Sequence, residues 1–261
     1  MIITIFSADE FAKRSIIALN LAADCLLDHR KVLLVDATAA QYALSWNARR
    51  SRSGAGGKSK IVMRSSEDLQ SELEDPASYY RSRYQEIIID ADGSNVRITD
   101  ALLVATDVLV IPVHARQNIN REALIQRIET LRLFNPALRV LIVEIQAMSA
   151  FASDVITETN PARLVAKEIL TSTLADTAIH EWIDDRSIFD QGLSIFECNP
   201  RNQRAIAEIK DLHQEITKTR TQPVEPAANS LAILHALQRR TQEKQLCHIG
   251  VDVLQREPVR G

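Results

Sequence analysis

The side chains best suited to chemistry in this sequence stand where a predicted helix begins and a predicted strand ends. Arg14 and Ser15 open the first long helical stretch. The unpaired N–H groups of a helix N-terminus favour anions, so this pair suits a bound phosphate. Asp90 and Asp92 follow an apolar run, where carboxylates suit a magnesium ion. Two simpler interpretations stay open, a solvated helix start and a polar turn before Gly93.

Short β-rich runs alternate with helical stretches over the first 220 residues, which predicts a parallel sheet covered on both faces. Most of the runs are continuously apolar, as strands buried on both faces should be. We therefore predict a three-layer α/β fold with a mostly parallel sheet and helices on both faces. The predicted strands are Ile2–Phe6, Val32–Val35, Lys60–Met63, Glu86–Ile89, Val108–Val113 and Val140–Ile145, with a weaker one near Thr177–Trp182. The predicted helices are Ala12–Asp28, Ser66–Leu73, Ile98–Ala105, Asn120–Phe134, Ala162–Leu174 and Arg201–Thr217.

Some of these helices carry further signals. Asn160-Pro161 and Asn199-Pro200 each place a capping side chain before a proline of the first helical turn. Ala12–Asp28 is apolar nearly all round, so we expect it to be deeply buried. After the α/β domain of residues 1–219, we expect a linker over residues 220–229 and a C-terminal helix and tail over residues 230–261.

The composition is that of a globular protein, with 46% hydrophobic and 25% charged residues among 261. A net charge of −3 excludes a globally basic nucleic-acid binder but leaves room for local patches. No apolar run reaches the roughly 18 residues of a membrane span, and the N-terminus indicates a strand, not a signal peptide, so we expect a cytoplasmic protein. The three cysteines share no metal-type spacing and the six histidines show no paired spacing with acids or cysteines, so we expect structural roles for them.

Several segments form a recognisable series along the chain. A strand, a loop of about eight residues, a buried helix and a second strand ending in Asp36 come first, and Trp46 lies ten residues farther on. Tyr84-Gln-Glu-Ile-Ile-Ile-Asp90-Ala-Asp-Gly93 and Gly192-Leu-Ser-Ile-Phe-Glu197 follow. Together, between Met1 and Thr219, they resemble the ParA/MinD family of deviant-Walker ATPases, and within it the short plasmid-partition ParA proteins. The resemblance implies the P-loop NTPase fold, with Asp90 in its Walker B strand.

The loop that should hold phosphate departs from the family's pattern. Relatives have Lys-Gly-Gly-x-Gly-Lys-Thr, and this chain has Asp9-Glu-Phe-Ala-Lys-Arg-Ser15. The chain has only seven glycines, about 2.7% against roughly 7% on average, and none lies before Gly54. Glycine lets backbone N–H groups wrap a phosphate with no Cβ in the way, so this loop predicts lost or weakened nucleotide binding.

The resemblance leaves residual roles to five positions and assigns no catalytic residue outright. Lys13, Arg14 and Ser15 are the degenerate nucleotide-binding residues; Arg14 is in register with the P-loop lysine and Ser15 with the magnesium-binding hydroxyl. Ser15 and Asp90 would hold the metal, and Asp90 and Asp36 are the residual Walker B and strand-end acids. ATP and Mg²⁺ are therefore expected as cofactors only if this residual site works.

A basic segment from Arg49 to Arg64 contains three clustered glycines and no acid. We predict a flexible loop here that contacts DNA phosphates, with solvated charge as the alternative interpretation. The candidate DNA-binding residues are Arg49, Arg50, Arg52, Lys58, Lys60 and Arg64.

The resemblance implies a ParA-like protein of DNA segregation or conjugative DNA transfer. The degenerate loop favours a pseudo-ATPase, a homodimer or heterodimer that works through a ParB-like adaptor or a component of a transfer machinery, with nonspecific DNA contacts. Two alternatives stay open: a protein-interaction scaffold without DNA binding, and an active ParA-type ATPase with an atypical loop. Membrane attachment through the tail is not expected.

Overall fold

The structure is a computed structural model that describes residues 1–7, 13–53, 62–65, 76–93, 96–114, 120–146, 160–181, 186–199 and 201–218. Its strands are β1 (Ile2–Phe6), β2 (Val32–Ala37), β3 (Val62–Ser65), β4 (Glu86–Ala91), β5 (Val108–His114), β6 (Arg139–Gln146), β7 (Ser172–Leu174) and β8 (Ile179–His180). Its helices are α1 (Arg14–Leu27), α2 (Tyr42–Ser53), α4 (Pro76–Arg83), α5 (Val96–Val104), α6 (Arg121–Phe134), α7 (Pro161–Glu168), α8 (Arg186–Asp190) and α9 (Gln203–Lys218).

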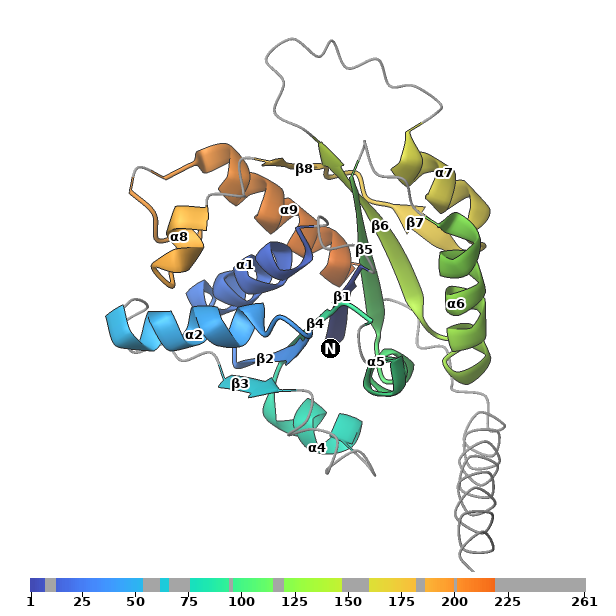
Figure 1. Ribbon diagram of the computed structural model, residues 1–261, viewed down its shortest axis with the longest axis horizontal. Coiled ribbons are helices and arrows are strands. Elements are labelled where there is room, and N and C mark those ends of the chain that lie inside the picture. Colours follow the sequence, from blue (N-terminus) through green and yellow to red (C-terminus); the bar gives the residue numbers. More distant parts are fainter. Residues whose placement is uncertain are drawn as a thin grey trace, which may run out of the picture.

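The strands form one sheet in the order β3-β2-β4-β1-β5-β6-β7, with β8 also paired to β6 (Figure 1). All pairings among these described strands are parallel. Parallel neighbours need crossover connections, and helices supply them on both faces of the sheet. The predicted parallel α/β architecture is thus confirmed.

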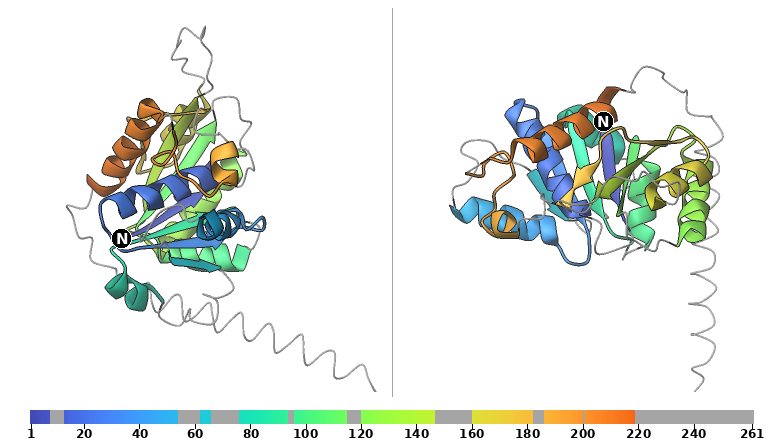
Figure 2. Two further views of the ribbon diagram at one scale, coloured as in Figure 1. Left: turned by 90° about the vertical axis from the view of Figure 1, so that its left-hand side faces the viewer. Right: turned by 90° about the horizontal axis from the view of Figure 1, so that it is seen from above.

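Two hydrophobic cores, one on each face of the sheet, give the molecule three layers (Figures 1 and 2). One core joins the sheet to α1, α2, α8 and α9, and the other joins it to α4, α5, α6 and α7. Helix α1 is buried along most of its length, from Ile16 to Cys25, because it lies between the sheet and neighbouring helices. Its apolar character on all sides is thereby explained.

Two parts of the predicted element pattern were wrong, and the helices α4 and α8 were not predicted. The basic segment is not a loop throughout, because α2 reaches Ser53 and β3 begins at Val62. The helix predicted over Ala162–Leu174 ends at Glu168, because Ile169 is extended (φ −86°, ψ 110°), and Thr171 then takes a left-handed turn (φ 58°) before β7. The helix predicted over Arg201–Thr217 is confirmed as α9, which begins at Gln203, with the Asn202 side chain accepting the N–H of Ala205 in its first turn. The start signal at Asn160 is confirmed, since its side chain accepts the N–H of Ala162.

A docking segment, residues 192–197, ties the last part of the domain to α2. The Trp46 indole Nε1 donates to the carbonyl of Leu193 at 2.9 Å. Gly192 has φ +73°, and a Cβ there would lie 2.3 Å from the backbone N of Arg50. Only glycine permits this close approach, so the segment and the helix pack backbone against backbone.

Within the described parts of the chain, every helix is too short or too polar to cross a bilayer. The predicted helix over Ser66–Leu73, the linker of residues 220–229 and the tail of residues 230–261 lie outside the described residues.

Candidate nucleotide site

The residues to which the resemblance gives nucleotide and metal roles meet at the carboxyl ends of three central strands. Asp36 of β2 is the register partner of Asp90 in β4, and Ile5 of β1 is the partner of Asp90 on the other side. Helix α1 follows β1 and brings Arg14 and Ser15 to the same edge. This is where open parallel sheets bind ligands, because loops and helix N-termini converge there.

Arg14 does not reach outward from this edge but turns onto the sheet. Its Nε donates to Oδ1 of Asp90 at 2.5 Å, and its Nη1 donates to the carbonyl of Ser7 at 3.0 Å. The Asp90 side chain is fully buried and that of Arg14 is 11% exposed. Arg14 therefore places its positive charge on the buried carboxylate of Asp90.

Burial governs the protonation of Asp90. It raises the pKa of this carboxyl to about 6, although the Arg14 guanidinium and the Ser15 hydroxyl both favour the ionised form; the nearby Asp36 disfavours it. The Ser15 and Asp90 side chains thus lie within hydrogen-bond reach of each other. A buried carboxylate needs a counter-charge, and within this site Arg14 provides it.

The Asp36 carboxylate accepts hydrogen bonds from the part of the chain that follows it. Its Oδ1 accepts the N–H of Thr38 at 3.1 Å and the Thr38 hydroxyl at 2.6 Å, and its Oδ2 accepts the N–H of Leu44 at 3.0 Å. The residue is buried, with 1% of its surface exposed. Asp36 therefore holds the turn between β2 and α2 and satisfies an N–H in the first turn of that helix.

The backbone at Lys13 keeps a conformation that suits glycine. Lys13 precedes α1 with φ 38° and ψ 10°, in the left-handed region, and its carbonyl accepts the N–H of Ile17. A non-glycine residue there costs roughly 1–2 kcal/mol. In the resemblance this position belongs to the last glycine of the loop; residues 8–12, the rest of the departure, lie outside the described residues.

The candidate DNA-binding residues lie in different elements of the structure. Arg49 and Arg52 are carried by the last turns of α2, where Arg52 is exposed and Arg49 pairs with Asp190 at 2.9 Å. Arg64 lies in β3, and Lys58 and Lys60 lie outside the described residues.

Arg50 corrects the prediction, because it is buried and already paired. Its guanidinium forms two hydrogen bonds of 2.5 Å to the Glu197 carboxylate and lies over the Trp46 ring, 5.2 Å from the centroid. Burial disfavours the ionised form of Glu197, but hydrogen bonds from Arg50 and Ser194 outweigh this effect and lower the pKa of that carboxyl. An arginine so enclosed cannot contact DNA phosphates, and Arg50 is withdrawn from the DNA-binding candidates.

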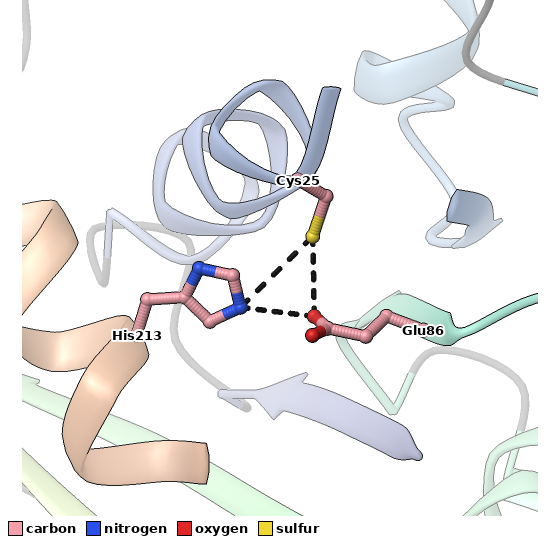
Figure 3. A group of neighbouring side chains, drawn as sticks. All are labelled: Cys25, Glu86 and His213. Atoms are coloured by element: carbon pink, nitrogen blue, oxygen red, sulfur yellow. Dashed lines mark hydrogen bonds and ion pairs between the residues drawn. The ribbon is translucent and has the colours of Figure 1, made fainter. Parts of the chain in front are cut away.

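A second cluster, at the opposite end of the sheet, was missed by the sequence analysis. Cys25 of α1, Glu86 at the start of β4 and His213 of α9 point toward one another and are buried (Figure 3). Burial alone would lower the pKa of His213, but the hydrogen bonds with Asp24, Cys25 and Glu86 outweigh burial and raise that pKa. Burial raises the pKa of the Cys25 thiol. Residues so distant in sequence give no spacing signal, which explains why the cluster was not foreseen.

Comparison with known proteins defines the fold. No protein-family model matches the chain, and no curated protein matches its sequence. Its structure is similar to that of McdA from Cyanthece in the apo form, with 15% identity over 82% of this chain and 98% of that chain and a TM-score of 0.59. A plasmid partition protein from Borrelia burgdorferi aligns with 16% identity over 84% and 98% of the two chains and a TM-score of 0.52. The chain has the ParA/MinD fold.

A third similar structure was solved with nucleotide. The septum site-determining protein MinD from Pyrococcus horikoshii, in complex with Mg-ADP, shares 16% identity over 86% of this chain and 99% of that chain, with a TM-score of 0.53. These similarities cover nearly the whole length of the other ParA/MinD-fold chains, so the resemblance stated from the sequence is confirmed at the level of the fold.

Proposed function

We propose that this protein is a ParA-like pseudo-ATPase of DNA segregation or conjugative DNA transfer, which positions DNA or a partner without a nucleotide cycle. The fold supports the ParA-like role, since a plasmid partition protein and a septum site-determining protein share it. The observation that carries the pseudo-ATPase part is the ion pair between Arg14 and Asp90.

The residues present fit Mg·ATP poorly. Arg14 donates to Asp90, and both carboxylate oxygens of Asp36 accept hydrogen bonds from backbone and hydroxyl donors. Phosphoryl transfer depends on positioning and charge stabilisation, so each group diverted to packing removes part of the catalysis. The loop Asp9–Ser15 adds side chains where relatives have bare backbone. These residues therefore do not form a site for ATP hydrolysis.

Hydrolysis assays test this part directly. Steady-state ATP turnover is measured with and without duplex DNA, for the wild type and for Asp90→Ala. We expect the same background rate in both, because Asp90 has no role in turnover. ATP turnover by the wild type that disappears in Asp90→Ala would instead establish an active ATPase with an atypical loop.

The ParA-like role also implies a partner protein, a ParB-like adaptor or a component of a transfer machinery, and nonspecific contact with DNA. Arg49 and Arg52 are the candidates for that contact in the last turns of α2, where Arg52 is exposed and Arg49 is half-buried beside Asp190. Phosphate contacts are largely independent of base sequence and weaken steeply with salt.

Gel shifts with nonspecific duplex DNA at low and moderate salt separate this proposal from a scaffold. We expect salt-sensitive binding by the wild type that is lost in the double variant Arg49→Ala/Arg52→Ala. Arg121→Ala is the matched control, since Arg121 is as exposed as Arg49 (41% against 42%) but belongs to α6 on the other face. No DNA binding at low salt would favour the protein-interaction scaffold without DNA binding.

A further inference from the structure

Three potential metal ligands converge at the end of the sheet opposite the candidate nucleotide site (Figure 3). The Cys25 sulfur lies 3.1 Å from Glu86 Oε2 and 3.9 Å from His213 Nε2, and Glu86 Oε2 and His213 Nε2 are 2.9 Å apart. Their exposed fractions are 0%, 4% and 3%. Three elements far apart in the sequence, α1, β4 and α9, thus direct one sulfur, one oxygen and one nitrogen to a common point.

These separations match the spacing of ligands around a small tetrahedral ion. With metal–sulfur bonds of about 2.3 Å and metal–nitrogen or metal–oxygen bonds of about 2.0–2.1 Å, tetrahedral ligand atoms lie roughly 3.3–3.6 Å apart. Each of the three distances lies within about 0.5 Å of that range. Movements of a few tenths of an ångström would therefore suffice to seat the ion, with water in the fourth position.

The surroundings orient the histidine as a ligand. Asp24 Oδ2 lies 2.6 Å from His213 Nδ1, so this carboxylate fixes the ring and leaves Nε2 facing Cys25 and Glu86. A carboxylate on the far nitrogen is the usual support of a metal-bound imidazole. Arg30 Nη1 donates to the other oxygen of Glu86, Oε1, which leaves Oε2 for the ion, and Arg30 Nη2 lies 3.4 Å and 3.5 Å from Nδ1 and Nε2 of His213.

The charge of the cluster permits a divalent cation. Without one, the carboxylates of Asp24 and Glu86 face the imidazolium of His213 and the guanidinium of Arg30, and Cys25 is a neutral thiol. Ligation takes one proton from the thiol and one from the imidazolium, since thiolate and neutral imidazole are the binding forms. A divalent ion thus replaces two protons, and the net charge of the buried cluster does not change.

We propose that Cys25, Glu86 and His213 form a binding site for Zn²⁺ or a similar thiophilic divalent ion, which fastens α9 to α1 and the sheet. A thiolate–imidazole–carboxylate set selects such ions over Mg²⁺ or Ca²⁺. A cavity of about 590 Å³ lies beside the cluster, with Arg30, Tyr84 and Glu86 among its lining residues. The site goes beyond the proposed function and does not depend on it, because it shares no residue with the nucleotide-site edge.

Cobalt titration of the full-length chain tests the site. Co²⁺ bound through a thiolate gives a sulfur-to-metal charge-transfer band and tetrahedral d–d bands, and Zn²⁺ should displace it one for one. The double variant Cys198→Ser/Cys247→Ser keeps Cys25 as the single thiol of the chain and should retain the band in full. A wild-type chain with no charge-transfer band, or a band that disappears in this double variant, would overturn the proposal.

Variants within the cluster complete the test. Cys25→Ser should abolish the band, and Asp24→Asn, which keeps all three ligands, should weaken Zn²⁺ affinity by about 10–100-fold. His180→Gln is the matched control, because His180 pairs with Glu208 at 2.8 Å in a similar way but has no place in the cluster. Should Cys25→Ser fail to fold, Asp24→Asn and the single-thiol chain decide the matter. Zn²⁺ affinity equal in Asp24→Asn and the wild type would contradict the site.

Discussion

Replacing Arg14 by methionine should destabilise the protein at pH 8 and have little effect at pH 5. The Asp90 carboxyl is fully buried, and Arg14 Nε lies 2.5 Å from its Oδ1. Removing one partner of a buried pair costs about 3–5 kcal/mol, and we take the lower end because Arg14 is 11% exposed. About 3 kcal/mol corresponds to a fall in Tm of roughly 6–12 °C for a domain of this size.

The pH dependence follows from the protonation of Asp90. Its pKa in the folded protein, about 6, is raised above the ordinary 3.8, so the cost of ionising it is absent at low pH and complete once the pH has risen through 6. At pH 5 the carboxyl is largely protonated in wild type and variant alike, and Arg14 has little charge to neutralise. The penalty of Arg14→Met therefore appears as the pH rises.

A double-mutant cycle measures the pair itself. Urea unfolding at pH 8 and pH 5 is compared for the wild type, Arg14→Met, Asp90→Asn and the double variant. The double variant should recover most of the stability that the single variants lose. The coupling free energy between Arg14 and Asp90 is then about 3 kcal/mol at pH 8 and less than about 1 kcal/mol at pH 5. Additive single effects at pH 8 would refute the reasoning, since Arg14 would then be available to a ligand.

Three further changes probe the framework around the site. Gly192→Ala should lower the unfolding free energy by about 3 kcal/mol, because the new Cβ would lie 2.3 Å from the Arg50 backbone N; an unchanged melting temperature would contradict that contact. Arg50→Met should lower the free energy of unfolding by about 2 kcal/mol at pH 7, because Glu197 loses its partner. The pKa of Glu197 is lowered from 4.5, so the pair's contribution is complete above that value, and urea unfolding should show the difference vanish as the pH falls through the lowered pKa. Asp36→Ala should cost about 2–3 kcal/mol, since buried donors of Thr38 lose their acceptor, and a thermal melt matching the wild type would show that Asp36 is not structural.

The fold could be predicted because its signals are local. Continuous apolar runs such as Val108–Val113 identify strands buried on both faces, and the all-round apolar helix from Ala12 can only be an interior one. Helix α2 was missed because its arginines suggested solvent. Its inner face rests on Trp46 and on Arg50, whose charge is cancelled by Glu197, a residue far away in the sequence.

The candidate site could be predicted only in part. Parallel strands place their carboxyl ends together, so the proximity of Arg14 and Asp90 followed from topology. The direction of the Arg14 side chain did not, because it depends on the need of a buried carboxylate for a counter-charge. The Cys25–Glu86–His213 cluster exists only after α9 has packed against α1, and no spacing in the sequence encodes that contact.

Calorimetric titration of the wild-type chain with Mg·ATP tests the central claim most directly, with Arg14→Ala alongside. Arg14 held on Asp90 predicts no saturable binding up to about 1 mM nucleotide, which means a binding free energy weaker than about −4 kcal/mol, and no difference between the two proteins. Micromolar Mg·ATP affinity in the wild type that is abolished in Arg14→Ala would contradict it, because the guanidinium would then serve a phosphate and not the aspartate.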